Sequence, residues 1–173
     1  MGQPERISQM SILISKYLIK AYELPTEKAR SDTSSFSVYD QILESEEKSS
    51  LIQFGYSKDR RPDLRQYRQM LATLDPLGMP LLGVTLAGNG TDESDYLPTW
   101  RKMTEIIGQR EVLYLADSKA STWDNRAKIH EEGGIYCFPL AMSQPRPKLL
   151  ADWVKSPPTE VIKTHIPHFN LKY

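Results

Sequence analysis

The chain has 173 residues, with 22 Lys plus Arg balanced by 22 Asp plus Glu, and 39% of its residues are hydrophobic. This length fits one globular domain or a large part of one, and the composition excludes wholesale disorder. Zero formal charge excludes a domain that is basic over its whole surface, although not a local basic patch. The lone Cys137 excludes an intrachain disulfide, and the longest apolar stretch is too short for a membrane span. We therefore expect a soluble, cytoplasmic protein without membrane contact.

The first predicted element is an amphipathic helix over 7–22, where apolar residues recur every three or four positions before Pro25. The run 36–39 has the β-branched and aromatic character of a short strand. The acidic, Ser-rich stretch 44–50 predicts a solvated loop.

A hairpin is the clearest local pattern. The segment 67–74 can run extended into a turn over 75–78, and 80–86 then follows as the second strand. One face of the first strand would carry Met70, Ala72 and Leu74. A helix over 62–74 is the alternative, because its apolar residues also match a helical stripe.

The remaining elements alternate between helix and strand. An amphipathic helix over 96–107 with Gly108 as its stop precedes a continuous apolar run, 112–116, which is typical of a buried central strand. A helix over 122–132 and a strand over 135–140 follow. This order predicts an α/β fold with a mixed sheet flanked by helices.

We divide the chain into an N-terminal helical segment (1–27), a core (28–142) and a Pro-rich tail (143–173). The tail has room for a short helix around 149–154 and resembles a connection to a further domain.

Two aspartates follow or open predicted strands. Asp32 stands at the entry to the first strand, and Asp117 follows the buried run. If those strands are neighbours, the two carboxylates converge at one sheet edge and can share Mg²⁺ or Mn²⁺, which prefer hard oxygen ligands. The alternative is that Asp32 caps a turn and Asp117 caps the following helix.

The segment 32–139 resembles the catalytic core of DDE transposases from bacterial insertion sequences, in the branch with a β-rich insertion before the catalytic Glu. The resemblance is carried by ordered blocks, namely Arg30-Ser31-Asp32-Thr33-Ser34-Ser35-Phe36-Ser37-Val38-Tyr39, Gly55-Tyr56-Ser57-Lys58-Asp59-Arg60-Arg61-Pro62-Asp63-Leu64-Arg65-Gln66, Gly78-Met79-Pro80-Leu81, Gly88-Asn89-Gly90-Thr91-Asp92, Ala116-Asp117-Ser118-Lys119-Ala120 and Gly133-Gly134-Ile135-Tyr136-Cys137-Phe138-Pro139-Leu140.

This resemblance implies an RNase H-like core in which Asp32 and Asp117 are catalytic and hold Mg²⁺ or Mn²⁺. It implies cleavage and strand transfer at DNA phosphodiester bonds, with transposon ends and target DNA as partners, no small-molecule cofactor, and a possible homo-oligomer in the full-length parent. Absence of a Gly-rich phosphate loop agrees with this chemistry rather than with nucleotide hydrolysis.

No residue matches the family's catalytic Glu. Glu131 and Glu132 follow Asp117 too closely and fit a solvated helix surface, and Glu160 lies in the Pro-rich tail. We therefore expect a fragment that lacks the insertion and the last catalytic helix, with little activity alone. The alternatives are a non-catalytic DNA-binding remnant on the same scaffold and a decaying gene product.

Five cations within 11 residues form a basic cluster that could contact a DNA backbone. The basic cluster consists of Lys58, Arg60, Arg61, Arg65 and Arg68. A solvated loop and strand face, paired with Asp59 and Asp63, explains it equally well. Lys119 could reach a phosphate near the metal site or be a plain surface lysine.

Other residues give weaker signals. Trp100 and Trp123 fall on predicted helical faces, where core positions are the more common role. His165 and His168, taken with Cys137, lack zinc-ligand spacing.

Overall fold

The computed structural model describes residues 4–39, 51–56, 60–142 and 146–156. The chain divides into two compact units, Met1–Leu140 and Ala141–Tyr173. The second unit contains the helix α4 (Arg146–Lys155), which includes the short helix predicted in the tail. The loop predicted over 44–50 lies outside the described residues. Across the described ranges, no helix combines the length and the apolar character that a membrane crossing requires.

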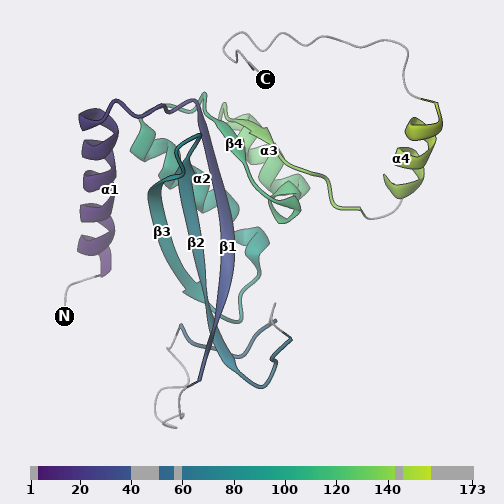
Figure 1. Ribbon diagram of the computed structural model, residues 1–173, viewed down its shortest axis with the longest axis horizontal. Coiled ribbons are helices and arrows are strands. Elements are labelled where there is room, and N and C mark those ends of the chain that lie inside the picture. Colours follow the sequence, from purple (N-terminus) through teal and green to yellow (C-terminus); the bar gives the residue numbers. More distant parts are fainter. Residues whose placement is uncertain (1–3, 40–50, 57–59, 143–145, 157–173) are drawn as a thin grey trace. The chain divides into compact units, whose positions relative to one another are not determined.

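A five-stranded mixed sheet organises the first unit (Figure 1). Its strands are β1 (Lys28–Val38), β2 (Arg65–Leu74), β3 (Met79–Ala87), β4 (Leu113–Leu115) and β5 (Ile135–Cys137). Their order across the sheet is β3-β2-β1-β4-β5; β1, β2 and β3 are antiparallel neighbours, while β4 runs parallel to both β1 and β5. The expected α/β fold, an RNase H-like mixed sheet flanked by helices, is confirmed.

The predicted hairpin is confirmed as β2 and β3, and the alternative helix over 62–74 is wrong. Met70, Ala72 and Leu74 are buried on one face, as an alternating strand requires. The strand β2 pairs along its whole length with β1, and from Tyr67 onward also with β3. The backbone hydrogen bonds to the two neighbouring strands therefore stabilise this segment as a strand, although its apolar spacing also fits a helix.

The first strand is much longer than the predicted run 36–39, and it begins at Lys28. Its inward residues Ala29, Ser31 and Thr33 are small and buried. Ala29 and Ser31 do not favour a strand by themselves, so the pairing with β2 and β4 rather than local sequence sets its length. As a result, Asp32 lies in the interior of β1, and its predicted place at the strand entry is wrong.

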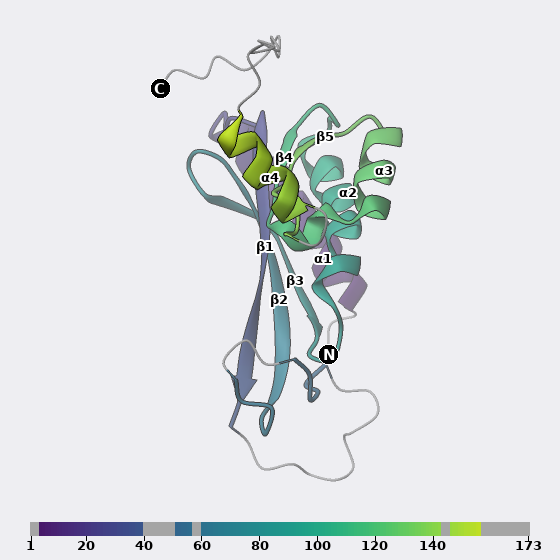
Figure 2. The same cartoon turned by 90° about the vertical axis from the view of Figure 1, so that its right-hand side faces the viewer.

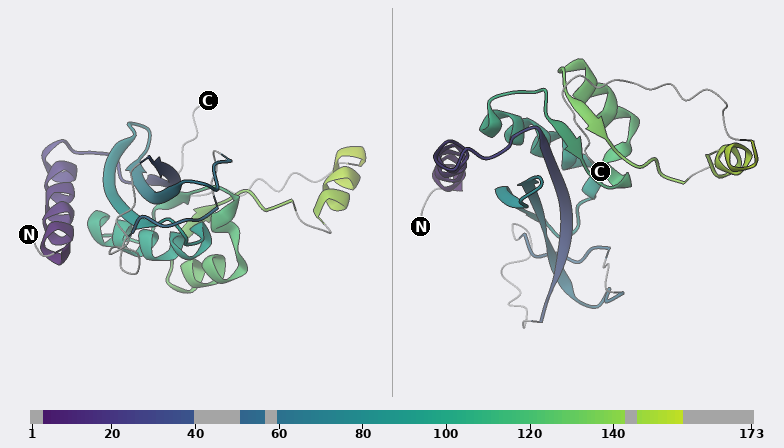
Figure 3. Two further views of the ribbon diagram at one scale, coloured as in Figure 1. Left: turned by 90° about the horizontal axis from the view of Figure 1, so that it is seen from below. Right: turned by 45° about the horizontal axis from the view of Figure 1, so that its top comes forward.

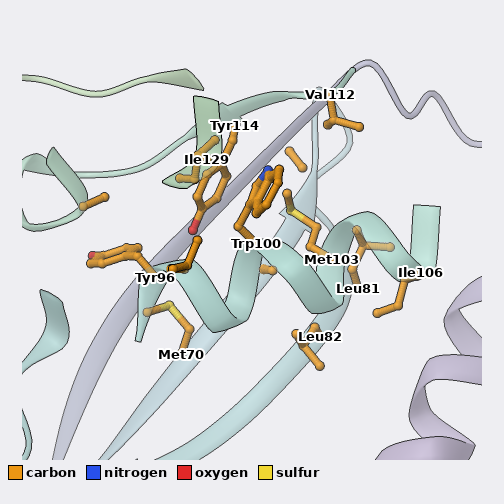
Figure 4. Packing of buried hydrophobic residues seen from close by; sticks show 14 of the residues in the cluster. Met70, Leu81, Leu82, Tyr96, Trp100, Met103, Ile106, Val112, Tyr114 and Ile129 are labelled. Carbon is orange, nitrogen blue, oxygen red and sulfur yellow. The ribbon is translucent and has the colours of Figure 1, made fainter. Parts of the chain in front are cut away.

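Two helices, α2 (Tyr96–Ile107) and α3 (Trp123–Glu131), lie on the same side of the sheet (Figure 2). The core between sheet and helices contains Tyr96, Trp100 and Met103, none of which is exposed (Figure 4). The helix α2 has the predicted bounds, and its cap Gly108 has a φ of 83°, a left-handed conformation that glycine adopts without strain.

The helix α1 (Pro4–Ala21) is confirmed, and only some of its apolar residues contact the core. It lies beside β3 and contacts α2 (Figures 1 and 3). Its partly buried residues Ile12 and Ile19 pack against the core, and Ser15 Oγ donates a hydrogen bond to Leu81 O at 2.7 Å. Other apolar residues of the periodic pattern are exposed, among them Ile7, Met10, Ile14 and Tyr17. A helix at the sheet's edge touches the core along a narrow strip, which helical periodicity alone does not locate.

Candidate functional site

The two predicted aspartates stand equally far beyond the last paired residues of two neighbouring strands, Asp32 within β1 and Asp117 just after the end of β4. In the parallel pairing of β1 with β4, Arg30 lies opposite Leu115. Asp32 stands two residues beyond Arg30, and Asp117 stands two residues beyond Leu115. The sheet therefore brings together two residues that are far apart in the sequence, and we call them the aspartate pair.

Each carboxylate of the aspartate pair is held by hydrogen bonds to one of its oxygens. Asp32 Oδ1 accepts from the Thr33 backbone N–H at 2.8 Å. Asp117 Oδ1 accepts from the Lys119 backbone N–H at 2.9 Å and from the Tyr96 hydroxyl at 2.7 Å. In the part of the chain that the structure describes, no hydrogen bond reaches Oδ2 of either residue. Both residues are exposed, so these second oxygens remain open to a ligand.

The capping alternative holds for one aspartate and fails for the other. Asp117 is the N-cap of the short 3-10 helix η3 (Ser118–Ser121), through its bond from the Lys119 N–H. Asp32 caps no turn, because it lies inside a long strand. Capping therefore orients Asp117 and occupies one of its oxygens, which leaves the other available.

Tyr96 is a site residue that sequence reasoning missed. It is the first residue of α2 and is not exposed at all. Burial raises the pKa of its hydroxyl well above the usual range, and the hydrogen bond and charge of Asp117 raise it further. The negative charge of Asp32 acts in the same direction, so one buried hydroxyl senses both carboxylates. Its spacing to Trp100 and Met103 predicts burial, but only the tertiary fold gives it Asp117 as a partner.

The aspartate pair fits a hard divalent cation. Mg²⁺ usually takes one or two carboxylates and completes its shell with water and substrate phosphate oxygens. Asp32 and Asp117 offer such oxygens at one edge. Among the described residues, no group of three or more His, Cys, Asp or Glu side chains could hold a metal ion. The donor set therefore suits a cation that also uses water or phosphate.

The nearby glutamates do not join the pair. Glu132 forms ion pairs with Arg101 and Arg110, and the hydrogen bond from Arg101 holds the pKa of Glu132 below its usual range. Glu131 is exposed at the end of α3, as expected of a helix surface. Glu160, like His165 and His168, lies outside the described residues.

The structure disperses the basic cluster. Lys58 lies outside the described residues. Arg61 forms an exposed ion pair with Asp63 at 2.7 Å. Arg60 and Arg65 have no ion-pair partner within the described ranges, so they are the members available to a phosphate.

Arg68 has a structural role instead. Its side chain is 6% exposed, and its Nη1 lies 2.8 Å from Asp92 Oδ1 and 2.7 Å from Asp95 Oδ2. Burial alone would lower the pKa of Arg68, but the hydrogen bonds with the two aspartates outweigh it and raise that pKa. This triad ties β2 to the segment before α2 and removes Arg68 from the surface.

Lys119 lies beside the aspartate pair. Its Nζ is 3.5 Å from Glu93 Oε1, and its side chain is 57% exposed. Lys119 also lines a pocket of about 270 Å³ together with Tyr56 and Thr91. A loosely paired cation next to an open pocket remains accessible to a phosphate.

The two tryptophans differ. Trp100 is fully buried, as predicted. Trp123 is 78% exposed, so its predicted core position is wrong; the Arg126 guanidinium lies over its ring at 5.3 Å. Trp123 is the first residue of α3, and this position lies outside the face of α3 that buries Asn125 and Ile129.

No family model matches this chain, and no curated protein matches it. Among solved structures, the chain is similar to the Mos1 transposase paired-end complex with left transposon end, with a TM-score of 0.43 and 8% identity over 90% of this chain and 56% of that chain. A pre-cleavage Mos1 transpososome matches with a TM-score of 0.44 and 10% identity over 90% and 50% of the two chains.

The catalytic domain of Mos1 mariner transposase gives a TM-score of 0.39 and 10% identity, over 90% of this chain and 72% of that domain. The chain spans about half the length of the chains in the first two structures. Residue roles do not transfer at such low sequence identities, so we interpret the site from the geometry of this chain alone.

Proposed function

We propose that this chain carries part of the catalytic core of a DDE transposase of the insertion-sequence type. The parent reaction is metal-dependent cleavage and strand transfer at DNA phosphodiester bonds, and the chain alone has little activity because no third carboxylate joins Asp32 and Asp117 among the described residues. The observation that supports the proposal most is the β1 and β4 pairing, since Asp32 stands two residues beyond Arg30 and Asp117 two residues beyond its partner Leu115. The reaction class, DNA cleavage and strand transfer, is inferred from the resemblance of the sequence blocks around both residues to DDE transposases.

Asp32 and Asp117 would hold Mg²⁺ or Mn²⁺ through their open Oδ2 atoms. When bound, such a cation supplies charge stabilisation at phosphate oxygens and activates an attacking hydroxyl or water. The protein's own part is orientation, because each Oδ1 is already fixed by a hydrogen bond. Carboxylates fixed in this way need little rearrangement to accept the ion.

DNA would bind through a few separate cations rather than a basic surface. Arg60 and Arg65 are available for phosphate contacts, and Lys119 lies next to Asp117. A neutral protein with few such contacts should bind DNA weakly and in a salt-dependent way.

A second candidate is a DNA-binding module without catalysis. One observation favours it: within the described residues, no third metal-binding side chain joins the aspartate pair. Such a module would bind DNA through its cations and would be indifferent to Asp32 and Asp117.

Fluorescence anisotropy with a labelled DNA duplex separates the two candidates. The wild-type chain, the Asp32→Asn/Asp117→Asn variant and an Arg60→Ala/Arg65→Ala variant are titrated in Mg²⁺ and in EDTA. The proposal predicts that Mg²⁺ tightens binding by the wild type but not by the aspartate variant, while the arginine variant binds more weakly in both buffers. An identical Mg²⁺ response in wild type and aspartate variant would instead support the non-catalytic module.

A further inference from the structure

We infer that Tyr96 is a positioning residue for the cation site, holding the Asp117 carboxylate so that Oδ2 faces the ion. This inference rests on the proposed function, because it assigns Tyr96 a role in that same site. Tyr96 would touch neither the cation nor the DNA and would act through Asp117 alone.

The position of Tyr96 makes it a rigid support. Tyr96, Trp100 and Met103 lie on one face of α2 and are all fully buried. Figure 4 shows Tyr96 with its hydroxyl directed away from Trp100. The ring is therefore packed in the core, while the hydroxyl extends to Asp117 at 2.7 Å. One hydrogen bond thus links α2 to the end of β4.

The two hydrogen bonds that Asp117 accepts both end on the same carboxylate oxygen. The Tyr96 hydroxyl and the Lys119 backbone N–H both donate to Oδ1. A carboxylate with two fixed donors on one oxygen loses most of its rotational freedom, and its other oxygen takes a defined direction.

Tyr114 provides a matched control within the same core. It is also fully buried, and its hydroxyl is hydrogen bonded to Ser31 Oγ instead of a carboxylate. Burial raises the pKa of this hydroxyl as well. Tyr114→Phe therefore removes the same chemical group from the same core as Tyr96→Phe, but it leaves the donors of Asp117 in place.

The test measures Mn²⁺ affinity by water-proton relaxation, and thermal unfolding without metal, for the wild type, Tyr96→Phe and Tyr114→Phe. Tyr96→Phe should raise the Mn²⁺ Kd about 10- to 100-fold, the usual effect of losing a hydrogen-bond partner of a metal ligand. Tyr114→Phe should leave Kd within about 2-fold, although both variants lose similar thermal stability. Equal Kd values for the two variants would overturn the inference.

Two further variants keep the test decisive. Tyr96→Met removes the donor while its flexible side chain fills the core, and it should raise Kd as Tyr96→Phe does. On an Asp117→Asn background, Tyr96→Phe should have no further effect on Mn²⁺. If Asp117→Asn itself leaves Mn²⁺ binding unchanged, the proposed function fails together with the inference. If Asp117→Asn abolishes binding while Tyr96→Phe does not weaken it, the inference alone fails.

Discussion

The basic cluster and the aspartate pair are both groups of charged residues, but the fold separates the members of the first and brings those of the second together. The cluster is contiguous in sequence, yet Arg68 is buried in a triad and Arg61 is paired with Asp63. The two aspartates are far apart in sequence, yet the β1 and β4 register makes them neighbours. Charge density along the chain is therefore a poor guide to a surface patch, whereas the pairing of distant strands can bring isolated charged residues close together.

The largest expected effect comes from breaking the buried triad. Arg68→Met should lower the free energy of unfolding by about 3 kcal/mol, because it leaves Asp92 and Asp95 as mostly buried charges without a cation. Urea unfolding measures the loss. Adding Asp92→Asn and Asp95→Asn to Arg68→Met should recover part of it, since no charge is then stranded.

Arg65→Met is the matched control, since Arg65 lies on the same strand without an ion-pair partner in the described ranges. It should cost about 0.5 kcal/mol or less. Equal losses of stability for Arg65→Met and Arg68→Met would contradict the structural role that sets Arg68 apart from the rest of the basic cluster.

The available cations should matter for DNA rather than for stability. Arg60→Ala and Arg65→Ala together should lower DNA affinity and reduce the slope of log affinity against log salt by about 1 for each lost phosphate contact. Arg61→Ala should have a smaller effect, because Asp63 already neutralises Arg61. Anisotropy titrations between low and moderate salt measure these slopes.

Asp63→Ala sharpens the same comparison. It removes the carboxylate that pairs with Arg61, so DNA affinity should rise. No change in DNA affinity with either Asp63→Ala or Arg60→Ala/Arg65→Ala would place the DNA contact elsewhere on the protein.

An exposed ion pair should give the smallest effect. The hydrogen bond from Arg101 lowers the pKa of Glu132, so the pair stabilises the fold above the ordinary Glu pKa of 4.5. That contribution is lost as the pH falls through the lowered pKa, where Glu132 becomes protonated in the folded protein as well. Glu132→Gln should lower the melting temperature slightly at pH 7 and leave it unchanged in strong acid. The neighbour Glu131 is the control, and an equal shift for Glu131→Gln would contradict the assignment.

Apolar periodicity predicted the parts of the fold that depend on burial. The helix α2, the β2 and β3 hairpin and the central strand β4 all carry such patterns and form close to their expected bounds. The extent of β1 could not be predicted, because Ser31 and Thr33 are inward positions filled by small polar residues. Its length comes from pairing with strands that are distant in sequence.

The roles of Asp32 and Asp117 stay a prediction, but their proximity follows from the order of the strands, because β1 and β4 are neighbours in the sheet. The Tyr96 hydrogen bond and the Arg68 triad depend on which elements pack together, and no local pattern encodes this. Trp123 shows the same limit, because a short polar helix buries too few residues for its face to be read from sequence.

A double-mutant cycle on Mn²⁺ affinity tests the shared cation most directly. It compares the wild type with Asp32→Asn, Asp117→Asn and the double variant, with Asp124→Asn as an exposed control. If the two carboxylates hold one ion, each single variant should weaken Mn²⁺ by about 10-fold or more, and the double variant should lose little beyond either single one. Additive losses, or a loss equal to that of Asp124→Asn, would contradict a shared site.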